Sequence, residues 1–202
     1  MTDRAFFEVV LRQRACRSFA DEDVPDEDLV RMLDAAVHAP SAENAQPWVF
    51  VVVREPARRA AVADLTRRLW DGGARTSAEA RLDRRLLDEV DRATASGFGG
   101  APVLVVVAGD TGAGTPRRAL PSSILPAVQN LLLAAVALGY GSALTTLTTF
   151  AAPELRSLLE LPEGVEPLVV VPIGRPARPL GPPRREPVGV KAHRERYGEP
   201  FG

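Results

Sequence analysis

The stretch from Pro121 to Leu138 is apolar on nearly every side, and it constrains the fold more than any other part of the chain. Read as a helix, it directs a dense set of apolar side chains inward: Ile124, Leu125, Val128, Leu131, Leu132, Ala135 and Val136. A helix with so little polar surface lies in a core or at an interface between chains. Its longest apolar run, Leu131 to Leu138, has eight residues, whereas a membrane span needs about 18 or more. We therefore predict no membrane-spanning helix.

Runs of β-branched residues bounded by turn residues predict buried strands at 49–53, 103–108 and 167–173. The Thr- and Leu-rich stretch 142–149 is interpreted as a further strand. Apolar residues at helical spacing predict a short first helix ending near Arg12, and further helices at 26–37, 56–70, 76–94, 121–138 and 153–159. This alternation predicts a mixed α/β domain in which helices cover a central sheet. The highly charged helix 76–94 is expected either over a site or as a surface excursion.

The 202 residues carry a net charge of −1 and 46% of them are hydrophobic, as expected for a single domain spanning 1–202. Because positive charge is not in excess, we do not expect a nucleic-acid-binding protein. One cysteine, Cys16, excludes an internal disulfide, and two histidines offer few ligands for a zinc site. The first residues lack the apolar region of a signal peptide. These features predict a reducing, cytoplasmic location and no bound metal.

The motifs of the common catalytic classes are missing from the chain. It has no Walker loop, no G-x-S-x-G elbow and no H-E-x-x-H pair. Cys16 is either a nucleophile activated by Arg14 and Arg17 or a small buried filler, and the filler interpretation is favoured. His38, near a predicted helix end, is expected to cap that end or lie on the surface. An enzyme with so few acid–base groups must take its chemistry from a cofactor.

Two segments carry the groups that would recognise such a cofactor. The first, Arg14-Ala15-Cys16-Arg17-Ser18-Phe19, places two guanidinium groups three residues apart, which suits a phosphate or an anionic ring. The second, Ala39 to Trp48, supplies Asn44 and Gln46, whose amides both donate and accept hydrogen bonds. A solvated helix end and an ordinary helix–strand turn are the alternative interpretations. A proline-rich stretch, 175–202, holds Arg184 and Arg185 and either hangs free or runs across another surface.

The order and spacing of these motifs resemble the FMN-dependent nitroreductase family. The resemblance begins with Arg14-x-x-Arg17-x-Phe19 and Val24-Pro25, and continues with the specific segment Ala39-Pro40-Ser41-x-x-Asn44-x-Gln46-Pro47-Trp48. The stretches Ala127 to Ser142 and Ile173-Gly174-Arg175-Pro176, and a late Arg185, extend it over nearly the whole chain. It implies an α+β fold of three α/β/α layers on a mostly antiparallel sheet. It also implies a homodimer with FMN at the interface, in which the arm 175–202 wraps the partner.

The resemblance also implies roles for individual residues. The expected cofactor-binding residues are Arg14, Ala15, Arg17, Ser41, Asn44, Thr145, Thr146 and Arg185. Arg14, Arg185 and the backbone at Ala15 would hold the phosphate, and Arg17 would stabilise the negative charge that develops on the reduced ring. Ser41 and Asn44 would reach the flavin from the other subunit. The Thr145-Thr146-Leu147 stretch would run beside the ring and direct a backbone N–H toward flavin N5.

No protein side chain is expected to act as a catalytic nucleophile or acid, since the flavin carries the chemistry. The family often has arginine where this chain has Gln13, and serine or aspartate at Ala15. Either change removes a side-chain contact to the phosphate or ribityl chain, so we expect either that Arg12 or Arg184 compensates or that FMN binds more weakly.

The implied activity is reduction of nitroaromatics, quinones or similar electron-poor acceptors by NADH or NADPH, with hydride passing through N5 in ping-pong order. Alternatives on the same fold are flavin destruction, dehalogenation and dehydrogenation, or a flavin-binding dimer without turnover.

Overall fold

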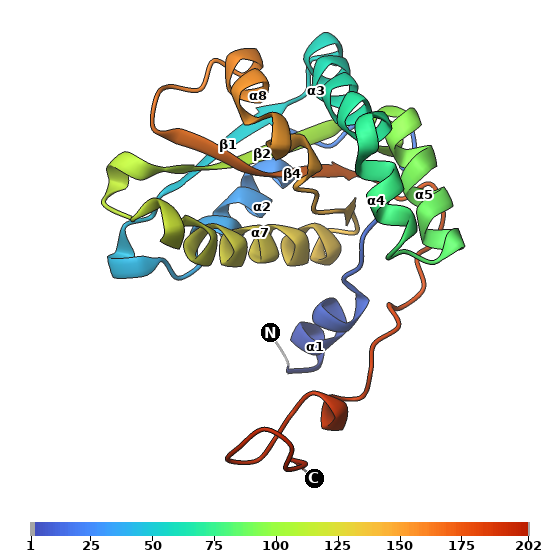
Figure 1. The fold of residues 1–202 in the computed structure, drawn as a ribbon, viewed down its shortest axis with the longest axis vertical. Coiled ribbons are helices and arrows are strands. Elements are labelled where there is room, and N and C mark those ends of the chain that lie inside the picture. Colours follow the sequence, from blue (N-terminus) through green and yellow to red (C-terminus); the bar gives the residue numbers. More distant parts are fainter. Residues whose placement is uncertain (1–2, 202) are drawn as a thin grey trace.

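The computed structural model describes residues 3–201, and its centre is a sheet of antiparallel strands in the order β1-β2-β4-β3 (Figure 1). The strands are β1 (Trp48–Val53), β2 (Val103–Asp110), β3 (Gly141–Ser142) and β4 (Val165–Gly174). The helices are α1 (Asp3–Arg12), α2 (Asp26–Val37), α3 (Pro56–Leu69), α4 (Arg75–Glu79), α5 (Arg84–Ala95), α6 (Gly97–Gly100), α7 (Leu120–Ala137) and α8 (Ala152–Leu158). The α+β class and the mostly antiparallel sheet expected from the sequence are confirmed.

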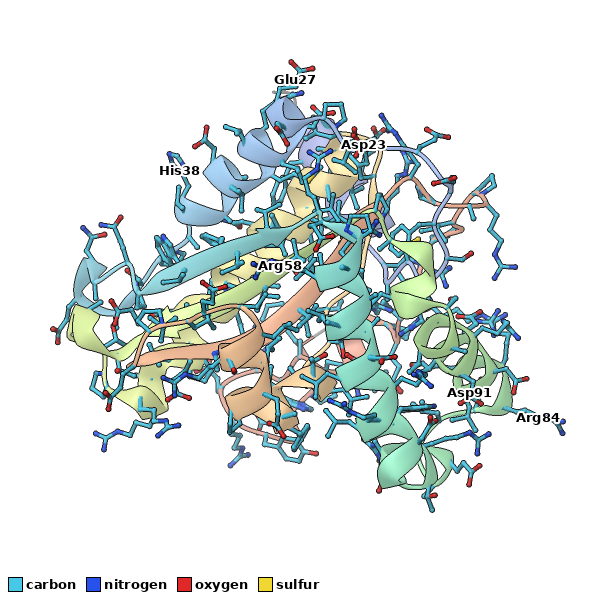
Figure 2. The ribbon with its side chains drawn as sticks, turned by 90° about the horizontal axis from the view of Figure 1, so that it is seen from above. Asp23, Glu27, His38, Arg58, Arg84 and Asp91 are labelled. Carbon is cyan, nitrogen blue, oxygen red and sulfur yellow. The ribbon has the colours of Figure 1, made fainter. Side chains whose placement is uncertain are left out.

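The middle strand β2 is buried on both faces, because helices cover each side of the sheet (Figure 2). Side chains alternate along a strand. Val103, Val105 and Val107 therefore pack in the core beneath α2 and α7. Leu104 and Val106 face the opposite way, into the core beneath α3 and α8. This two-sided burial explains why the strand is an uninterrupted apolar run rather than an alternating one.

Helix α7 accounts for the apolar stretch that dominates the sequence. One side of it lies in the core with α2 and the sheet through Ile124, Val128 and Leu131. Residues Arg117–Ala137 are long and apolar enough to cross a membrane by length and composition alone, and 44% of the apolar window is buried inside the fold. Packing against α2 and the sheet explains much of that apolarity. Leu125 on the other side is 44% exposed.

The predicted single helix at 76–94 is wrong, because a turn divides it into α4 and α5. The carboxylate of Asp83 accepts a hydrogen bond from the backbone N–H of Leu86 at 2.8 Å, and so starts a new helix. On the N-terminal side of α4, the helix predicted at 56–70 does not end at residue 70, because α3 continues into a π-helical turn, Trp70–Ala74.

The predicted strand at 142–149 is also mostly wrong. Only Gly141–Ser142 pairs with β4 as a strand, and Thr145 makes an isolated bridge with Val170. Between these two pairings, Ala143 N donates a hydrogen bond to Pro172 O of β4. Pro172 has no N–H to donate in return, so the ladder of hydrogen bonds is interrupted there. The backbone then turns into a 3-10 helix at Leu147–Ala151.

The residues after β4 form an extended segment, as expected from their prolines. Figure 1 shows α1 and the end of this arm standing away from the three layers, on the same side of the molecule. A single 3-10 turn, Val188–Val190, interrupts the described part of the arm. Val188, Tyr197 and Phe201 are largely exposed there.

Candidate functional site

The arginine motif lies on a short extended segment, 15–19, that is fastened to three distant parts of the chain. Cys16 N donates to the carbonyl of Ser142 at 2.8 Å, and Phe19 N donates to that of Gly99 at 2.9 Å. Ala177 N donates to the carbonyl of Ser18 at 3.0 Å. Ala15 forms a parallel bridge with Ser142, so the segment continues the sheet beyond β3. These backbone bonds fix the position from which Arg17 extends.

Two glycines allow this segment to pack so closely. A Cβ at Gly141 would lie 2.7 Å from the Sγ of Cys16, and one at Gly99 would lie 2.6 Å from the carbonyl carbon of Arg17. Gly99 also has a φ of +73°, which L side chains rarely adopt. In the G-Y-G sequence at 139–141, the glycine at 141 is therefore explained by close packing against Cys16. The sequence does not need to be interpreted as a phosphate-binding loop.

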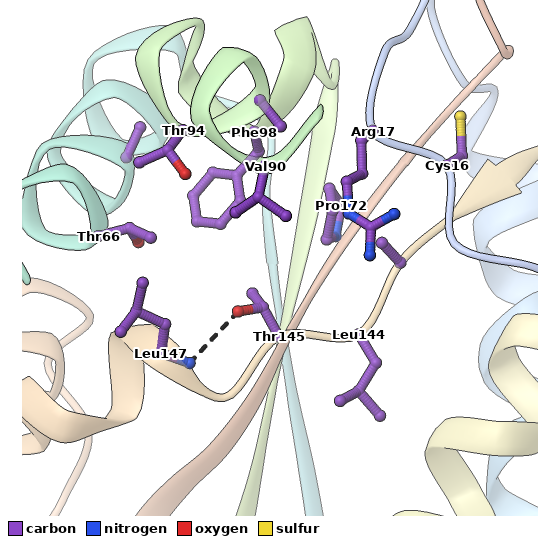
Figure 3. A pocket seen from close by; sticks show the side chains of 13 residues that line it. Cys16, Arg17, Thr66, Val90, Thr94, Phe98, Leu144, Thr145, Leu147 and Pro172 are labelled. Atoms are coloured by element: carbon purple, nitrogen blue, oxygen red, sulfur yellow. Dashed lines mark hydrogen bonds between the residues drawn. The ribbon is translucent and has the colours of Figure 1, made fainter. Parts of the chain in front are cut away.

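Arg17 stands at the junction of two connected cavities. Figure 3 shows its guanidinium directed into the first cavity, whereas the sulfur of Cys16 is turned away. We call this first cavity the apolar lobe; it contains about 690 Å³ of space, partly open to solvent. The guanidinium of Arg17 donates no hydrogen bond to any other described residue, and the side chain is 30% exposed. A half-buried guanidinium with free donors is suited to bind an anionic or carbonyl-bearing ligand.

The second cavity, here the polar lobe, is rich in arginine. Arg14, Arg92 and Arg178 line it together with Arg17, and Glu89 is the one carboxylate among the described lining residues. Arg14 donates to the carbonyl of Gly181 at 2.9 Å, which ties the start of the arm to this lobe. The excess of positive charge is appropriate for a phosphate.

One wall of the apolar lobe comes from the chain just after β3 (Figure 3). The Thr145 N–H donates to Val170 O at 3.0 Å, and the Leu147 N–H donates to the Thr145 hydroxyl at 3.3 Å. Within residues 3–201 the Thr146 N–H has no acceptor. Thr146 itself is exposed and does not line the lobe, whereas its neighbours Thr145 and Leu147 do.

The opposite wall is built by α3, α5 and α6. It presents Val90, Thr94 and Phe98, and Phe98 reaches the lobe from a backbone with a φ of +59° (Figure 3). Below them the hydroxyls of Thr66 and Thr148 lie 2.7 Å apart, both buried. Helix α5 thus lines the candidate cleft, which favours one of the two alternatives left open by the sequence.

Cys16 borders both lobes, yet it is only 1% exposed. Its thiol lies 3.3 Å from the carbonyl of Ser18. Burial raises the pKa of this thiol, and the neighbouring arginines only partly oppose that effect. A raised pKa and a buried sulfur agree with the filler interpretation rather than with a nucleophile.

Two expected ligands lie far from this cleft in the same chain. The turn that holds Ser41 and Asn44 contacts the beginning of α7, where Ala42 N donates to the Ser123 hydroxyl. Segment 15–19 instead contacts Ser142, beyond the other end of α7. At about 1.5 Å per residue, the helix from Ser123 onward is about 20 Å long. One chain therefore cannot bring Ser41 and Asn44 to Arg17.

Within a single chain, the arm brings a different arginine to the polar lobe from those that the resemblance implies. Arg185 donates to the carbonyl of Arg184, is exposed and does not line either lobe. Arg178, which the sequence analysis did not select, takes a place in the polar lobe instead. Arg12 and Arg184, expected to compensate for Gln13, do not line the polar lobe either. His38 lies at the end of α2 as predicted, with its Nδ1 2.6 Å from Asp34 O (Figure 2).

A family model described as the nitroreductase family matches residues 10–175, the range that contains the sheet, both walls of the apolar lobe and the arginine segment. The chain belongs to the nitroreductase family. Among curated relatives, iodotyrosine deiodinase from Thermotoga neapolitana is 31% identical over 180 residues, covering 87% of this chain and 91% of that protein. A protein from Methanothermobacter thermautotrophicus, provisionally named NADH dehydrogenase/NAD(P)H nitroreductase, is 29% identical over 86% of this chain and 78% of its own length.

Solved nitroreductase-family structures agree with this assignment. A Desulfovibrio desulfuricans protein in complex with FMN superimposes with a TM-score of 0.75 at 27% identity, over 95% of this chain and 97% of that one. A nitroreductase with bound FMN from Desulfitobacterium hafniense has a TM-score of 0.74 at 24% identity, with coverage of 93% and 96%, and supports the fold. This nitroreductase-family chain is therefore similar along its length to proteins that were crystallised with a flavin.

Proposed function

We propose that this chain binds FMN in the two-lobed cleft and acts as an NAD(P)H-dependent oxidoreductase on electron-poor acceptors such as nitroaromatics and quinones. The observation that carries the proposal is the guanidinium of Arg17, which has no hydrogen-bond acceptor among the described residues and stands where the two lobes meet. The cleft fits an aromatic ring joined to a phosphate, since one lobe is mainly apolar and the other cationic.

The residues present fit FMN in detail. Arg14, with Arg178 in place of the missing arginine at Gln13, would hold the phosphate in the polar lobe. Arg17 would hold the pyrimidine edge of the ring, and the amide of Thr146, between the lining residues Thr145 and Leu147, would face its centre. Segment 15–19 is fixed by backbone bonds to distant parts of the chain, so the backbone that carries Arg17 is already in place before a ligand binds.

When bound, FMN supplies the redox chemistry by taking two electrons from NADH or NADPH and passing them to the acceptor. The protein's own part is to bind, orient and exclude water. Val90 and Phe98 on one wall of the apolar lobe and Leu147 on the other surround a bound ring with apolar groups, which strengthens the electrostatic effect of Arg17 inside the lobe. A positive charge held there favours a ring that gains negative charge.

We further propose a homodimer in which a second copy supplies Ser41 and Asn44 to each cleft. The exposed apolar side chains support this arrangement, since Phe6, Phe7 and Leu11 of α1 and Leu125 of α7 are each at least 44% exposed. Helix α1 packs against α7, so the exposed apolar side chains lie on two helices that are in contact. Large apolar patches of this kind mark interfaces between chains. The arm 175–202 would then lie across the partner rather than in solvent.

Reductive dehalogenation is a second candidate, because the Thermotoga deiodinase matches this chain over 91% of its own length. The same cleft and the same flavin would serve it. The acceptor alone separates the two candidates, so a comparison of a nitroaromatic, a quinone and a halogenated phenol as oxidants of the reduced protein would decide between them.

The test is the visible spectrum of the purified protein with FMN, recorded anaerobically before and after addition of NADPH or NADH. We expect a bound flavin spectrum that bleaches. Arg17→Ala should weaken FMN binding at least tenfold, and Arg17→Lys should restore part of the loss. Arg84→Ala is the matched control, since Arg84 lies on α5 and points to solvent (Figure 2). Absence of FMN binding, or equal affinities for Arg17→Ala and Arg84→Ala, would overturn the proposal.

A further inference from the structure

Glu89 is a carboxylate placed among the arginines of the polar lobe. It belongs to α5, the helix that covers the cleft, and its side chain is only 17% exposed. Most acidic side chains of α5 serve other purposes: Asp88 is exposed, and Asp91 accepts hydrogen bonds from Trp70 and Arg75 outside the cleft. Glu89 alone of these points its charge toward the proposed cofactor site.

The carboxylate of Glu89 lies between two guanidinium groups without hydrogen-bonding to either. Its Oε2 is 3.8 Å from Nη1 of Arg17, and its Oε1 is 3.9 Å from Nη2 of Arg178. These distances are too long for hydrogen bonds. The interaction is therefore electrostatic, and it leaves the N–H donors of Arg17 free for a ligand.

Glu89 partly compensates for the desolvation of the positive charge on Arg17. Burial lowers the pKa of Arg17, and the negative charge of Glu89 opposes that effect. The same charge acts on anything else that approaches the guanidinium. A ligand that gains negative charge beside Arg17 is attracted by the guanidinium and repelled by the carboxylate that lies next to it.

We propose that Glu89 is a positioning residue that holds the reduction potential of the bound flavin down by partly neutralising Arg17. The inference rests on the proposed function, because it needs FMN in the cleft. Since reduction places negative charge on the ring, a neutral side chain at position 89 leaves the full charge of Arg17 to stabilise the reduced form. The potential should then rise.

A structural explanation makes a different prediction. If Glu89 only fastens α5 to segment 15–19 and to the arm, its loss weakens binding of oxidised and reduced FMN alike. The affinity changes in that case, but the potential of the bound flavin does not, because the potential depends on the ratio of the two affinities.

The experiment measures the two-electron midpoint potential of protein-bound FMN, together with the affinity for oxidised FMN, in wild type, Glu89→Gln, Glu89→Asp and Asp88→Asn. Glu89→Gln should favour the reduced over the oxidised form by about tenfold, a rise of about 30 mV for a two-electron couple. Glu89→Asp keeps the charge and should stay close to wild type. Asp88→Asn removes the same charge from the solvent side of the same helix and is the matched control.

The outcomes separate the two proposals. A wild-type chain that binds no FMN overturns the proposed function and this inference with it. If wild type binds FMN but Glu89→Gln leaves the potential unchanged, or shifts it no more than Asp88→Asn does, the role of Glu89 is refuted while the proposed function stands.

Discussion

Replacing Gly99 by alanine should damage both the fold and the cleft, whereas the same change at Gly100 should damage neither severely. The two glycines are neighbours, and their φ values, +73° and +76°, are nearly equal. A Cβ at Gly99 would overlap the carbonyl group of Arg17, but a Cβ at Gly100 would meet nothing within 4 Å. The pair therefore separates the effect of backbone strain from the effect of a steric clash.

The magnitudes follow from these two terms. A left-handed backbone costs an alanine about 1–2 kcal/mol, and Gly100→Ala should lose about that much stability. Gly99→Ala adds overpacking of about 1–3 kcal/mol. It also strains the hydrogen bond from Phe19 N to Gly99 O, which contributes about 1 kcal/mol. We expect Gly99→Ala to be the less stable variant by about 2–4 kcal/mol.

Thermal unfolding measures this difference directly. For a chain of this length, 1 kcal/mol corresponds to about 2–4 °C in Tm, so the two variants should differ by about 4–16 °C. Gly99→Ala should also weaken FMN binding, because it displaces the segment that carries Arg17, and Gly100→Ala should not. Equal Tm values for the two variants would show that segment 15–19 is not held as closely as described, and would refute the reasoning.

Three further predictions concern other parts of the structure. Thr66→Val removes the partner of the buried Thr148 hydroxyl and should lower the free energy of unfolding by about 1–3 kcal/mol; urea unfolding measures this loss, and Thr66→Val/Thr148→Val should recover part of it. Cys16 should react with iodoacetamide at pH 8 at least tenfold more slowly in the folded protein than in urea, because burial raises the pKa of its thiol; equal rates would contradict its burial. Hydrogen bonds from Arg75 and Trp70 lower the pKa of Asp91, so its contribution to stability is present above the unfolded value of about 3.9 and is lost as pH falls through the lower folded value. The stability difference between wild type and Asp91→Asn should accordingly be constant above pH 5 and shrink below pH 4, and a difference that grows in acid would show the opposite sign.

Periodicity predicted the elements whose apolar residues face one core. The helix at 26–37 has acidic residues in its first turn and apolar residues at helical spacing, and α2 has those bounds. The helix boundary at Asp83 was missed although it carries a signal, since Asp is a frequent N-cap residue before a helical run. The prediction of a strand at 142–149 was wrong because Pro172, in the neighbouring strand β4, cannot donate a hydrogen bond to it. The pattern of residues 142–149 alone carries no information about that neighbour.

The candidate site was predictable only where its residues are close together in the sequence. Arg14 and Arg17 were selected from one short motif, and the structure places both in the cleft. Glu89, Arg92 and Arg178 were not selected, because isolated charged residues in polar segments resemble an ordinary solvated surface. Only the folded chain brings them together around Arg17.

The attachment of segment 15–19 has a consequence for the order of events during synthesis. This segment is made before all its bonding partners, since it bonds to Gly99, Ser142 and, through Ala20, to the carbonyl of Arg175. At about 5–20 residues per second, a ribosome reaches Arg175 on the order of 10–30 s after Arg17. Throughout that interval the arginines have no cleft to line. The cleft therefore cannot assemble before Arg175 has been made, and any ligand that it holds must be taken up after that point.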